Sequence, residues 1–175
     1  MFRLITAVVI LIAAWFYVSD SPPKKHKKIP LSKPTPVEQF MKKVAYIESG
    51  NNHRITNEFG MMGKYQFSPS TVRTLGFRVS NKNFLADTKL QDTVMLAYMK
   101  ANHRELKPLI KKYDGKIVKG IKVTRAGILA GAHFAGSGGV VAYFNTSGNG
   151  ITDARGTTVK KYMSYFSNFT LPEIL

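Results

Sequence analysis

The sequence predicts a mostly α-helical α+β domain that follows an N-terminal membrane segment. Apolar side chains recur at helical spacing in several segments after residue 36. Residues 51–63 break this pattern with asparagine, glycine and methionine, and we expect a loop or a small β-hairpin there. The chain has 175 residues, 44% of them hydrophobic, which suffices for one domain with a buried core plus an appendage. It contains no cysteine, which excludes disulfide and cysteine–metal frameworks.

The N-terminal residues 1–18 predict a membrane anchor. After Arg3, residues 4–18 carry no charge, and the length of this run lies between that of a signal-peptide core and that of a spanning helix. Aromatic residues 15–17 at its far end suit the interface of a membrane with water. No small-residue cleavage site follows, so we expect an uncleaved anchor, with a cleaved signal segment as the alternative.

Residues 19–35 predict an extended linker rich in proline and lysine. Together with Pro36 they hold five of the eight prolines, and they show no apolar periodicity. The folded domain is therefore expected at residues 36–175.

The first helix of that domain should place a carboxylate on its buried face. Thr35 can cap this helix, with Pro36 at its first position and Glu38 closing a capping box. The apolar stripe comprises Val37, Phe40, Met41 and Val44. Continued by four residues, the stripe reaches Glu48 in the last turn, and Gly50 then ends the helix.

This position makes Glu48 a candidate for acid–base chemistry. A carboxyl group on a desolvated face near a helix C-terminus can keep a proton near neutral pH and donate it as a general acid. The alternative is a glutamate that turns to solvent or pairs with Lys43 or Lys64, as most glutamates are exposed.

Further helices are expected downstream. Ser68 should cap a short helix that ends at Gly76. Asp87 should open a longer helix that Pro108 kinks or ends. Residues 111–122 are basic and interrupted by glycine, and we expect a solvated loop there.

The C-terminal part predicts two or more packed helices. Thr124 should cap a helix that runs through Ala135, and its small residues permit close contact with neighbouring helices. Glycines in residues 136–139 should break it before another helix begins. Thr157 or Thr158 should cap the last helix, whose inward residues are expected to be Val159, Tyr162, Met163 and Phe166.

Three short motifs occur in a fixed order along the domain. They are Glu48-Ser49, then Gly63-Lys64-Tyr65-Gln66, then residues 132–138 with the sequence Ala-His-Phe-Ala-Gly-Ser-Gly. In this order and spacing they resemble the motifs Glu-Ser, Gly-Leu-Met-Gln and Ala-Tyr-Asn-Ala-Gly-Pro-Gly of soluble lytic transglycosylases and goose-type lysozymes. The resemblance covers about residues 36–169 and implies a lysozyme-like fold that cleaves the glycan strand of peptidoglycan.

The resemblance also implies roles for single residues. Glu48 would be the only general acid/base, Ser49 would orient Glu48 or the sugar, and the backbone at Tyr65 and Gln66 would hold an N-acetyl group. Lys64-Tyr65 departs from Leu-Met, which makes the floor of the site more polar and aromatic.

The third motif departs from the family where His133-Phe134 replaces Tyr-Asn. His133 is therefore either a substrate-side residue or a hydrogen-bonded core histidine. Phe134 and Tyr143 are candidates for stacking on a sugar.

Three functions remain open at the level of the sequence. In lytic transglycosylases one glutamate protonates the glycosidic oxygen and then deprotonates the C6 hydroxyl of muramic acid, which gives a 1,6-anhydro product. A hydrolysing muramidase would need a second carboxylate, for which Glu58 in the following loop is the candidate. The third possible function is that of a catalytically inactive protein with the same fold that binds the cell wall or assists assembly. The four histidines show no metal-ligand spacing, and we expect no metal or cofactor.

The charge of the chain bears on its partners. There are 26 Lys and Arg against 10 Asp and Glu, a formal net charge of +16. No nucleic-acid-binding motif accompanies this charge, whereas anionic cell-wall polymers attract a cationic protein equally well. We expect a monomer that binds peptidoglycan glycan strands and, through residues 1–18, a membrane, and that does not bind nucleic acid.

The expected location is the periplasm or the cell-wall space, with the protein anchored or secreted. Four lysines at residues 24–28 would instead favour a cytoplasmic domain by the positive-inside rule. The motifs outweigh this local charge count because their substrate lies outside the membrane.

Overall fold

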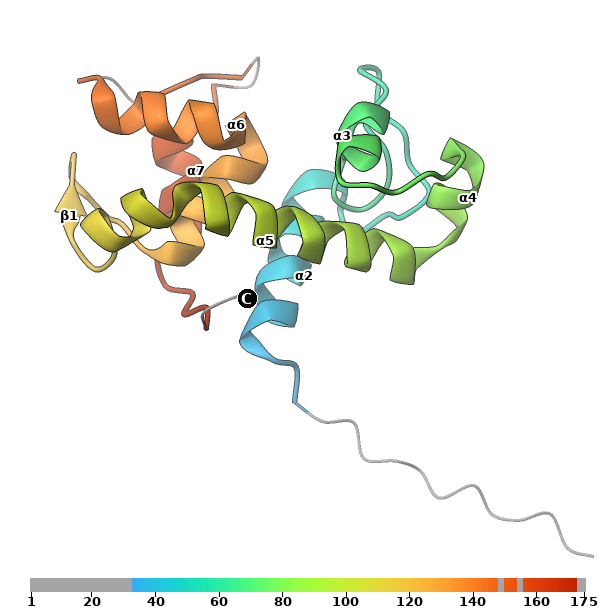
Figure 1. The fold of residues 1–175 in the computed structure, drawn as a ribbon, viewed down its shortest axis with the longest axis horizontal. Coiled ribbons are helices and arrows are strands. Elements are labelled where there is room, and N and C mark those ends of the chain that lie inside the picture. Colours follow the sequence, from blue (N-terminus) through green and yellow to red (C-terminus); the bar gives the residue numbers. More distant parts are fainter. Residues whose placement is uncertain (1–32, 148–149, 154–155, 173–175) are drawn as a thin grey trace, which may run out of the picture. The chain divides into compact units, whose positions relative to one another are not determined.

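A computed structural model describes residues 33–147, 150–153 and 156–172, and its elements agree with the α+β class predicted from the sequence. The described part is mostly helical, with one small two-stranded antiparallel sheet (Figure 1). From Pro34 onward it forms one compact unit. The predicted anchor at residues 1–18 and nearly all of the predicted linker lie outside the described residues.

Helix α2 (Pro36–Ser49) begins and ends where the sequence predicts. The Thr35 hydroxyl accepts from Glu38 N at 3.2 Å, and the Glu38 carboxylate accepts from Thr35 N at 2.7 Å, which completes the capping box. Gly50 closes the helix in the left-handed conformation, with φ at 62°. The buried residues are Phe40, Met41, Val44 and Ala45. This stripe leaves Glu48 partly buried in the last turn.

Three helices follow the loop after α2. They are α3 (Pro69–Thr74), capped by Ser68 as predicted, then α4 (Asn81–Ala86), then α5 (Thr88–Tyr113). The Asp87 carboxylate caps α5 by accepting from Leu90 N at 2.9 Å. The expectation that Pro108 could end α5 is wrong, because the helix continues for five residues beyond it. Leu106 and Ile110, on either side of Pro108, are both buried in the core, and this packing holds the helix together.

The only β-sheet of the described residues lies after α5, where the sequence suggested a solvated loop. Strands β1 (Ile117–Val118) and β2 (Ile121–Lys122) pair antiparallel. Lys119 and Gly120 form the turn with positive φ values of 49° and 78°, the geometry of a tight hairpin turn. By contrast, the segment after Glu48 forms a loop with isolated bridges rather than a hairpin.

Helices α6 (Arg125–Asn145) and α7 (Val159–Tyr165) pack closely against each other. A Cβ atom on Gly127 would lie 2.9 Å from the Met163 carbonyl oxygen, so only glycine permits this approach. Thr158 caps α7, and its four predicted inward residues are all buried. The predicted break falls at Gly136, whose non-helical φ of 71° and ψ of 167° separate two helical segments across a kink within α6.

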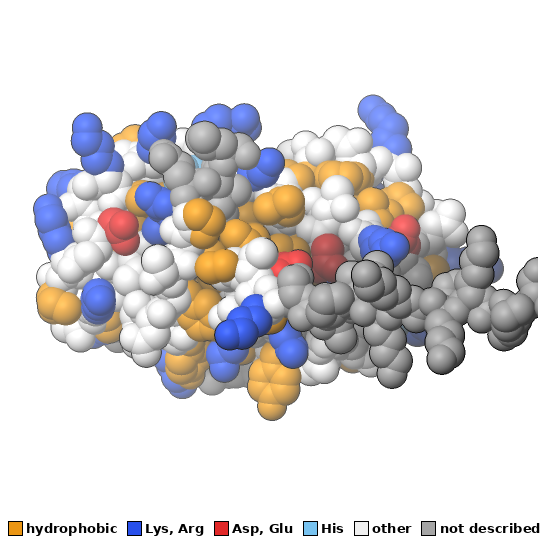
Figure 2. All heavy atoms as spheres, turned by 90° about the horizontal axis from the view of Figure 1, so that it is seen from below, with side chains coloured by type: hydrophobic (Ala, Val, Ile, Leu, Met, Phe, Trp, Pro, Cys, Tyr) orange, Lys and Arg blue, Asp and Glu red, His pale blue; other side chains and the backbone are white. Residues whose placement is uncertain are grey.

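Helix α5 runs along the domain, with α6 at one end and α4 at the other (Figure 1). Helix α5 contributes buried side chains to two hydrophobic clusters, and Phe134 packs against both clusters. Helix α6 is the one described helix that is long and apolar enough to cross a membrane, and half of that apolar stretch is buried inside the domain. Lysine and arginine side chains lie at several separate places on the face shown in Figure 2.

Candidate active site

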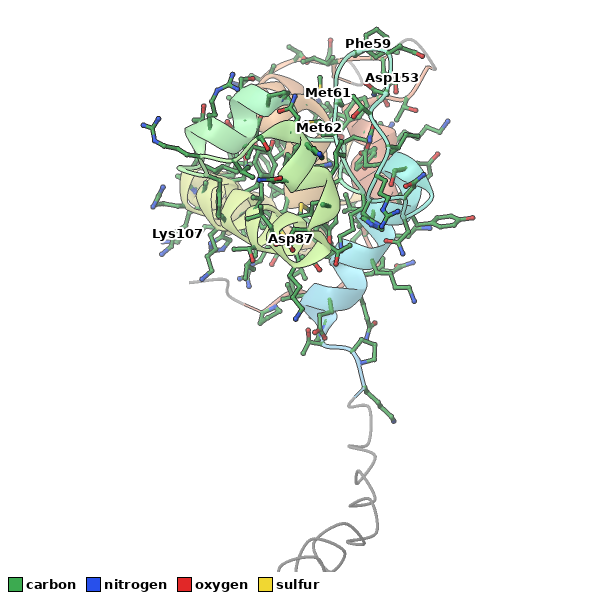
Figure 3. The ribbon with its side chains drawn as sticks, turned by 90° about the vertical axis from the view of Figure 1, so that its right-hand side faces the viewer. Phe59, Met61, Met62, Asp87, Lys107 and Asp153 are labelled. Carbon is green, nitrogen blue, oxygen red and sulfur yellow. The ribbon has the colours of Figure 1, made fainter. Side chains whose placement is uncertain are left out.

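A cavity of about 390 Å³ contains the side chain of Glu48. Its walls come from the end of α2, the loop that follows, α3, α5, α6 and the segment before α7. The lining residues are Glu48, Asn57, Phe59, Met61, Gln66, Phe67, Ser68, Thr71, Tyr98, His133, Phe134 and Asp153. Figure 3 shows Phe59, Met61 and Asp153 near one end of the domain, where two loops meet. The cavity therefore combines two carboxylates, the partly buried Glu48 and the exposed Asp153, with aromatic, amide and hydroxyl groups.

The carboxylate of Glu48 is held through one of its two oxygens. The hydroxyl of Tyr162, from α7, donates to Oε1 at 2.5 Å. Nε2 of His133, from α6, lies 3.6 Å from the same oxygen. The Glu48 side chain retains 22% of its exposure, so it is shielded but still reaches the cavity. Three helices thus fix the orientation of a single carboxylate.

Tyr162 is a neutral donor in this arrangement. Burial, followed by the charge of Glu48 and the hydrogen bond to it, raises the pKa of Tyr162 far above its ordinary value. Its ring stacks on Phe134 at 5.1 Å and on Phe166 at 5.7 Å, with interplanar angles of 20° and 23°. These contacts leave the tyrosine little freedom, so the position of its hydroxyl is set by packing.

His133 is buried against aromatic rings beside Glu48. Its side chain is 4% exposed and meets Phe67 and Tyr98 edge to face, at 5.4 and 5.7 Å. Burial lowers the pKa of His133, although the charge of Glu48 and a hydrogen bond to the Tyr65 backbone oppose this effect. Among the described residues its Nδ1 has no hydrogen-bond partner, whereas its Nε2 lies on the side of Glu48.

The loop at residues 63–67 is fastened to α5 by Gln91. This side chain is fully buried; its Oε1 accepts from Lys64 N at 2.9 Å, and its Nε2 donates to the carbonyl oxygens of His53 and Phe84 at 3.0 and 2.9 Å. A Cβ atom on Gly63 would lie 2.4 Å from Gln91 Oε1. The glycine of the second motif is thus explained by the close approach of this amide.

Ser49 joins the end of α2 to the same loop. Its hydroxyl lies 2.9 Å from the Lys64 carbonyl oxygen and 3.2 Å from the Ala45 carbonyl oxygen. Ser49 is not among the residues that line the cavity. In the structure it ties the loop to the end of α2, and its predicted role of orienting Glu48 or the sugar stays a prediction.

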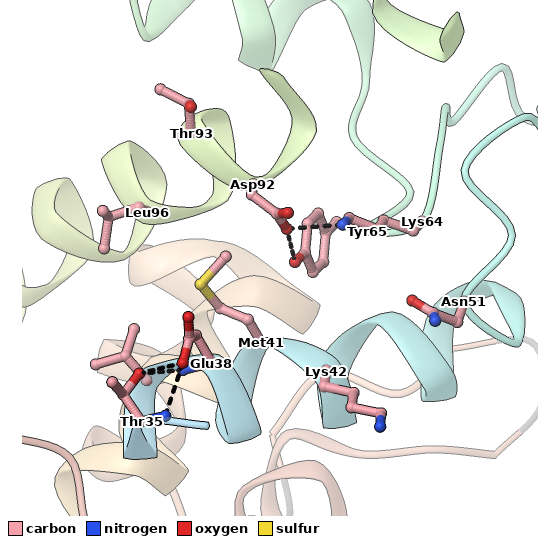
Figure 4. A pocket seen from close by; sticks show the side chains of 11 residues that line it. Thr35, Glu38, Met41, Lys42, Asn51, Lys64, Tyr65, Asp92, Thr93 and Leu96 are labelled. Carbon is pink, nitrogen blue, oxygen red and sulfur yellow. Dashed lines mark hydrogen bonds and ion pairs between the residues drawn. The ribbon is translucent and has the colours of Figure 1, made fainter. Parts of the chain in front are cut away.

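Lys64 and Tyr65 lie on the other side of the loop from Glu48. Lys64 Nζ is 2.8 Å from Asp92 Oδ1, and the Tyr65 hydroxyl donates to the same oxygen at 2.5 Å (Figure 4). Both residues line a separate pocket of about 570 Å³. That pocket is larger than the Glu48 cavity, but Lys64 is paired with Asp92 and Glu38 with Thr35. The Tyr65 side chain therefore belongs to the support of the loop.

Four of the predicted site residues come together in the Glu48 cavity: Glu48, Gln66, His133 and Phe134. Gln66 has a positive φ of 53°, and its Nε2 donates to the Gly63 carbonyl oxygen at 2.8 Å. One face of Phe134 is occupied by Tyr162, so at most its edge or its other face can meet a ligand.

Two predicted site residues lie elsewhere. Tyr143 is fully buried in the core between α6 and α7, and the prediction that it stacks on a sugar is wrong. Tyr143 lies in the helical segment after the kink at Gly136 and packs in the buried cluster that includes Val140 and Met163. Glu58 is exposed and is not a lining residue of the Glu48 cavity. The carboxylate that does share this cavity with Glu48 is Asp153.

Sequence reasoning missed the roles of Tyr162 and Asp153. The sequence correctly placed Tyr162 on the inward face of the last helix. A buried tyrosine hydroxyl needs a polar partner, so this position could have indicated a contact with a polar side chain. Asp153 gave no such signal, because it lies in an irregular segment.

Comparisons of the chain with protein-family models, with curated proteins and with solved structures find no significant match. The geometry of the site and the three motifs are therefore the features that bear on the function of this chain.

Proposed function

We propose that this chain is a peptidoglycan lytic transglycosylase with a lysozyme-like fold. The observation that carries the proposal is the Glu48 carboxylate, which is 22% exposed at the wall of a cavity and held through Oε1 by a buried tyrosine. A carboxyl group that is oriented, shielded and open on one side suits general acid–base catalysis. The order of the three motifs supports the same assignment.

The first step is protonation of the leaving group. In the proposed cycle the Tyr162 hydroxyl donates to Oε1, which leaves Oε2 to carry the proton that Glu48 transfers. Glu48 gives this proton to the glycosidic oxygen between N-acetylmuramic acid and N-acetylglucosamine. The bond from that oxygen to the anomeric carbon breaks, and N-acetylglucosamine leaves as an alcohol.

The second step restores the catalyst. The new Glu48 carboxylate is stabilised by the Tyr162 hydroxyl and by the neutral His133 ring at 3.6 Å. It takes the proton of the C6 hydroxyl of muramic acid while O6 bonds to the anomeric carbon. The product is a 1,6-anhydro ring, no water is consumed, and one carboxylate performs both proton transfers.

A polymeric substrate is favoured by the shape of the surface. A second hollow of about 310 Å³ adjoins the Glu48 cavity, because Thr71 and Tyr98 line both. The rigid loop that presents Gln66 suits an N-acetyl group, which needs a fixed donor or acceptor. Residues 1–18 would hold this domain outside the membrane, where the glycan strands lie.

A hydrolysing muramidase is the second candidate, and Asp153 favours it. Its carboxylate lines the same cavity as Glu48, and its Oδ1 accepts from Thr157 N at 2.7 Å. A second carboxylate opposite an acid is the arrangement that activates water in most glycoside hydrolases. In this version Asp153 replaces Glu58 as the predicted partner of Glu48.

Digestion of purified peptidoglycan in ¹⁸O-labelled water separates these candidates. We expect unlabelled anhydro-muramic ends by mass spectrometry, loss of activity in Glu48→Gln, and substantial activity in Asp153→Asn. Labelled reducing ends together with an inactive Asp153→Asn would identify a muramidase. If the unaltered chain cleaves no peptidoglycan, both enzymatic functions are excluded and a wall-binding protein is the remaining candidate. Glu58→Gln is the matched control, since it removes an exposed carboxylate of the adjoining loop.

A further inference from the structure

Phe59 is an exposed aromatic residue at the rim of the Glu48 cavity. Its side chain is 72% exposed, the highest value among the large hydrophobic residues that the structure exposes, and it is a lining residue of the cavity. Singly exposed apolar residues are common on protein surfaces and need no ligand. Phe59 differs from Tyr46, which is 67% exposed on α2 and does not line the cavity.

The loop holds Phe59 outward through a network of hydrogen bonds. The side-chain oxygen of Asn57 accepts from Phe59 N at 2.9 Å and from Met61 N at 3.0 Å. The Asn57 carbonyl accepts from Gly60 N, and Asn57 N donates to the Met61 carbonyl oxygen, both at 3.0 Å. Gly60 has a φ of 75°, which closes the turn. The exposure of Phe59 thus follows from a built turn (Figure 3).

The groups around Phe59 match the two surfaces of a sugar ring. A pyranose presents C–H groups on its face and hydroxyl or amide groups around its edge. An aromatic ring covers the face, because its negative π surface attracts the C–H groups and both apolar surfaces leave water. Asp153 and Gln66 line the same cavity and can meet the polar edge.

We propose that Phe59 is a binding platform on which an N-acetylated amino sugar of the glycan strand stacks, next to the bond that Glu48 cleaves. This role rests on the proposed function for the reaction, but binding to Phe59 is measurable without cleavage. Insertion of Phe59 into an anionic membrane is the competing use of an exposed aromatic side chain. The carboxylates of Glu48 and Asp153 in the same cavity disfavour it, because they repel an anionic lipid surface.

A tryptophan at position 59 reports directly on the platform. The full chain has one tryptophan, Trp15, so Trp15→Phe with Phe59→Trp gives a single fluorophore at the rim. Glu48→Gln is added to prevent cleavage. The probe is soluble glycan strands freed of their peptides, and the control is Trp15→Phe with Tyr46→Trp.

We expect a saturable blue shift of the position-59 fluorophore with glycan strands and none from position 46. An unchanged position-59 spectrum at glycan concentrations that saturate binding in a sedimentation assay, or an equal response of both fluorophores, would overturn the proposal. So would a blue shift with anionic vesicles and none with glycan.

Steady-state kinetics of glycan cleavage tests the role of Phe59 independently of fluorescence. Phe59→Ala should raise KM by roughly threefold to tenfold with kcat nearly unchanged, and Phe59→Tyr should restore KM. An unaltered KM in Phe59→Ala would contradict the platform. If the unaltered chain cleaves no glycan, the proposed function fails, and the fluorescence titration still decides whether Phe59 binds a sugar.

Discussion

Tyr162 and Glu48 make the shortest contact of the candidate site, and their hydrogen bond can be removed without altering the shape of the core. Tyr162→Phe keeps the ring stacked on Phe134 and Phe166 and removes only the hydroxyl. We expect glycan cleavage to fall by about tenfold to a hundredfold, since an unfixed carboxyl group loses its orientation. Circular dichroism should show an intact fold. Tyr165→Phe, at an exposed tyrosine of the same helix, is the control and should retain full activity.

His133 links the stability of the domain to pH. Burial lowers its pKa in the folded protein below the ordinary 6.5. Between these two values the unfolded chain binds a proton that the folded chain does not, so the free energy of unfolding falls as the pH drops below about 6.5. The loss is at most about 1.4 kcal/mol per pH unit and stops below the folded pKa.

His133→Gln should weaken this dependence, because it removes the titrating group from both states. The measurement is urea unfolding of both chains at about pH 7.5 and pH 5.5. Equal losses of stability in the two chains would show that the partly exposed Glu48, which faces His133, or other groups dominate the titration.

Among the structural elements, the loop at residues 63–67 depends on one amide. Gly63→Ala should destabilise the domain by about 2 kcal/mol or more, because its Cβ would meet Gln91 Oε1 at 2.4 Å and φ would remain at 72°. In Gln91→Ala the amide is absent, so adding Gly63→Ala should do less harm than it does in the unaltered chain. A double-mutant cycle by urea unfolding measures this coupling. Strict additivity would mean that the two groups do not touch.

Helix α6 offers a graded test with three glycines. A Cβ at Gly138 meets nothing within 4 Å, one at Gly131 meets the flexible Met163 side chain at 2.9 Å, and one at Gly127 meets the Met163 backbone oxygen at 2.9 Å. Alanine raises helix stability by up to about 1 kcal/mol over glycine in open space. Thermal unfolding should therefore rank Gly138→Ala above the unaltered chain and Gly127→Ala lowest. A stabilising Gly127→Ala would contradict the close packing of α6 on α7.

The elements also show what the sequence could and could not predict. Helix α2 was predicted nearly to the residue, because its capping box, apolar stripe and terminal Gly50 are local signals. The hairpin after α5 was missed, since its lysines indicated a solvated loop and the Lys119-Gly120 turn was read as an interruption. The contact of Tyr162 with Glu48 spans 114 positions, and no local pattern determines which distant hydroxyl meets a given carboxylate.

At the scale of the whole molecule, charge should govern adsorption to the cell wall. The formal net charge is +16, and lysine and arginine side chains are spread over the face shown in Figure 2. Binding of Glu48→Gln to isolated walls should weaken strongly as salt rises, because the charges are exposed and screened. A pull-down across a salt series measures this effect. Adsorption that does not change with salt would show that glycan contacts alone hold the protein.

The contact between Glu48 and Tyr162 also bears on when activity can arise. A ribosome or an export channel releases the chain from its N-terminus, so Glu48 emerges 114 residues before Tyr162. Until α7 has emerged and docked on α6, the carboxylate lacks the hydroxyl that fixes it. The proposed enzyme would therefore stay inert while it is being made or moved, and would become able to cut the wall only after nearly the whole domain has arrived and folded.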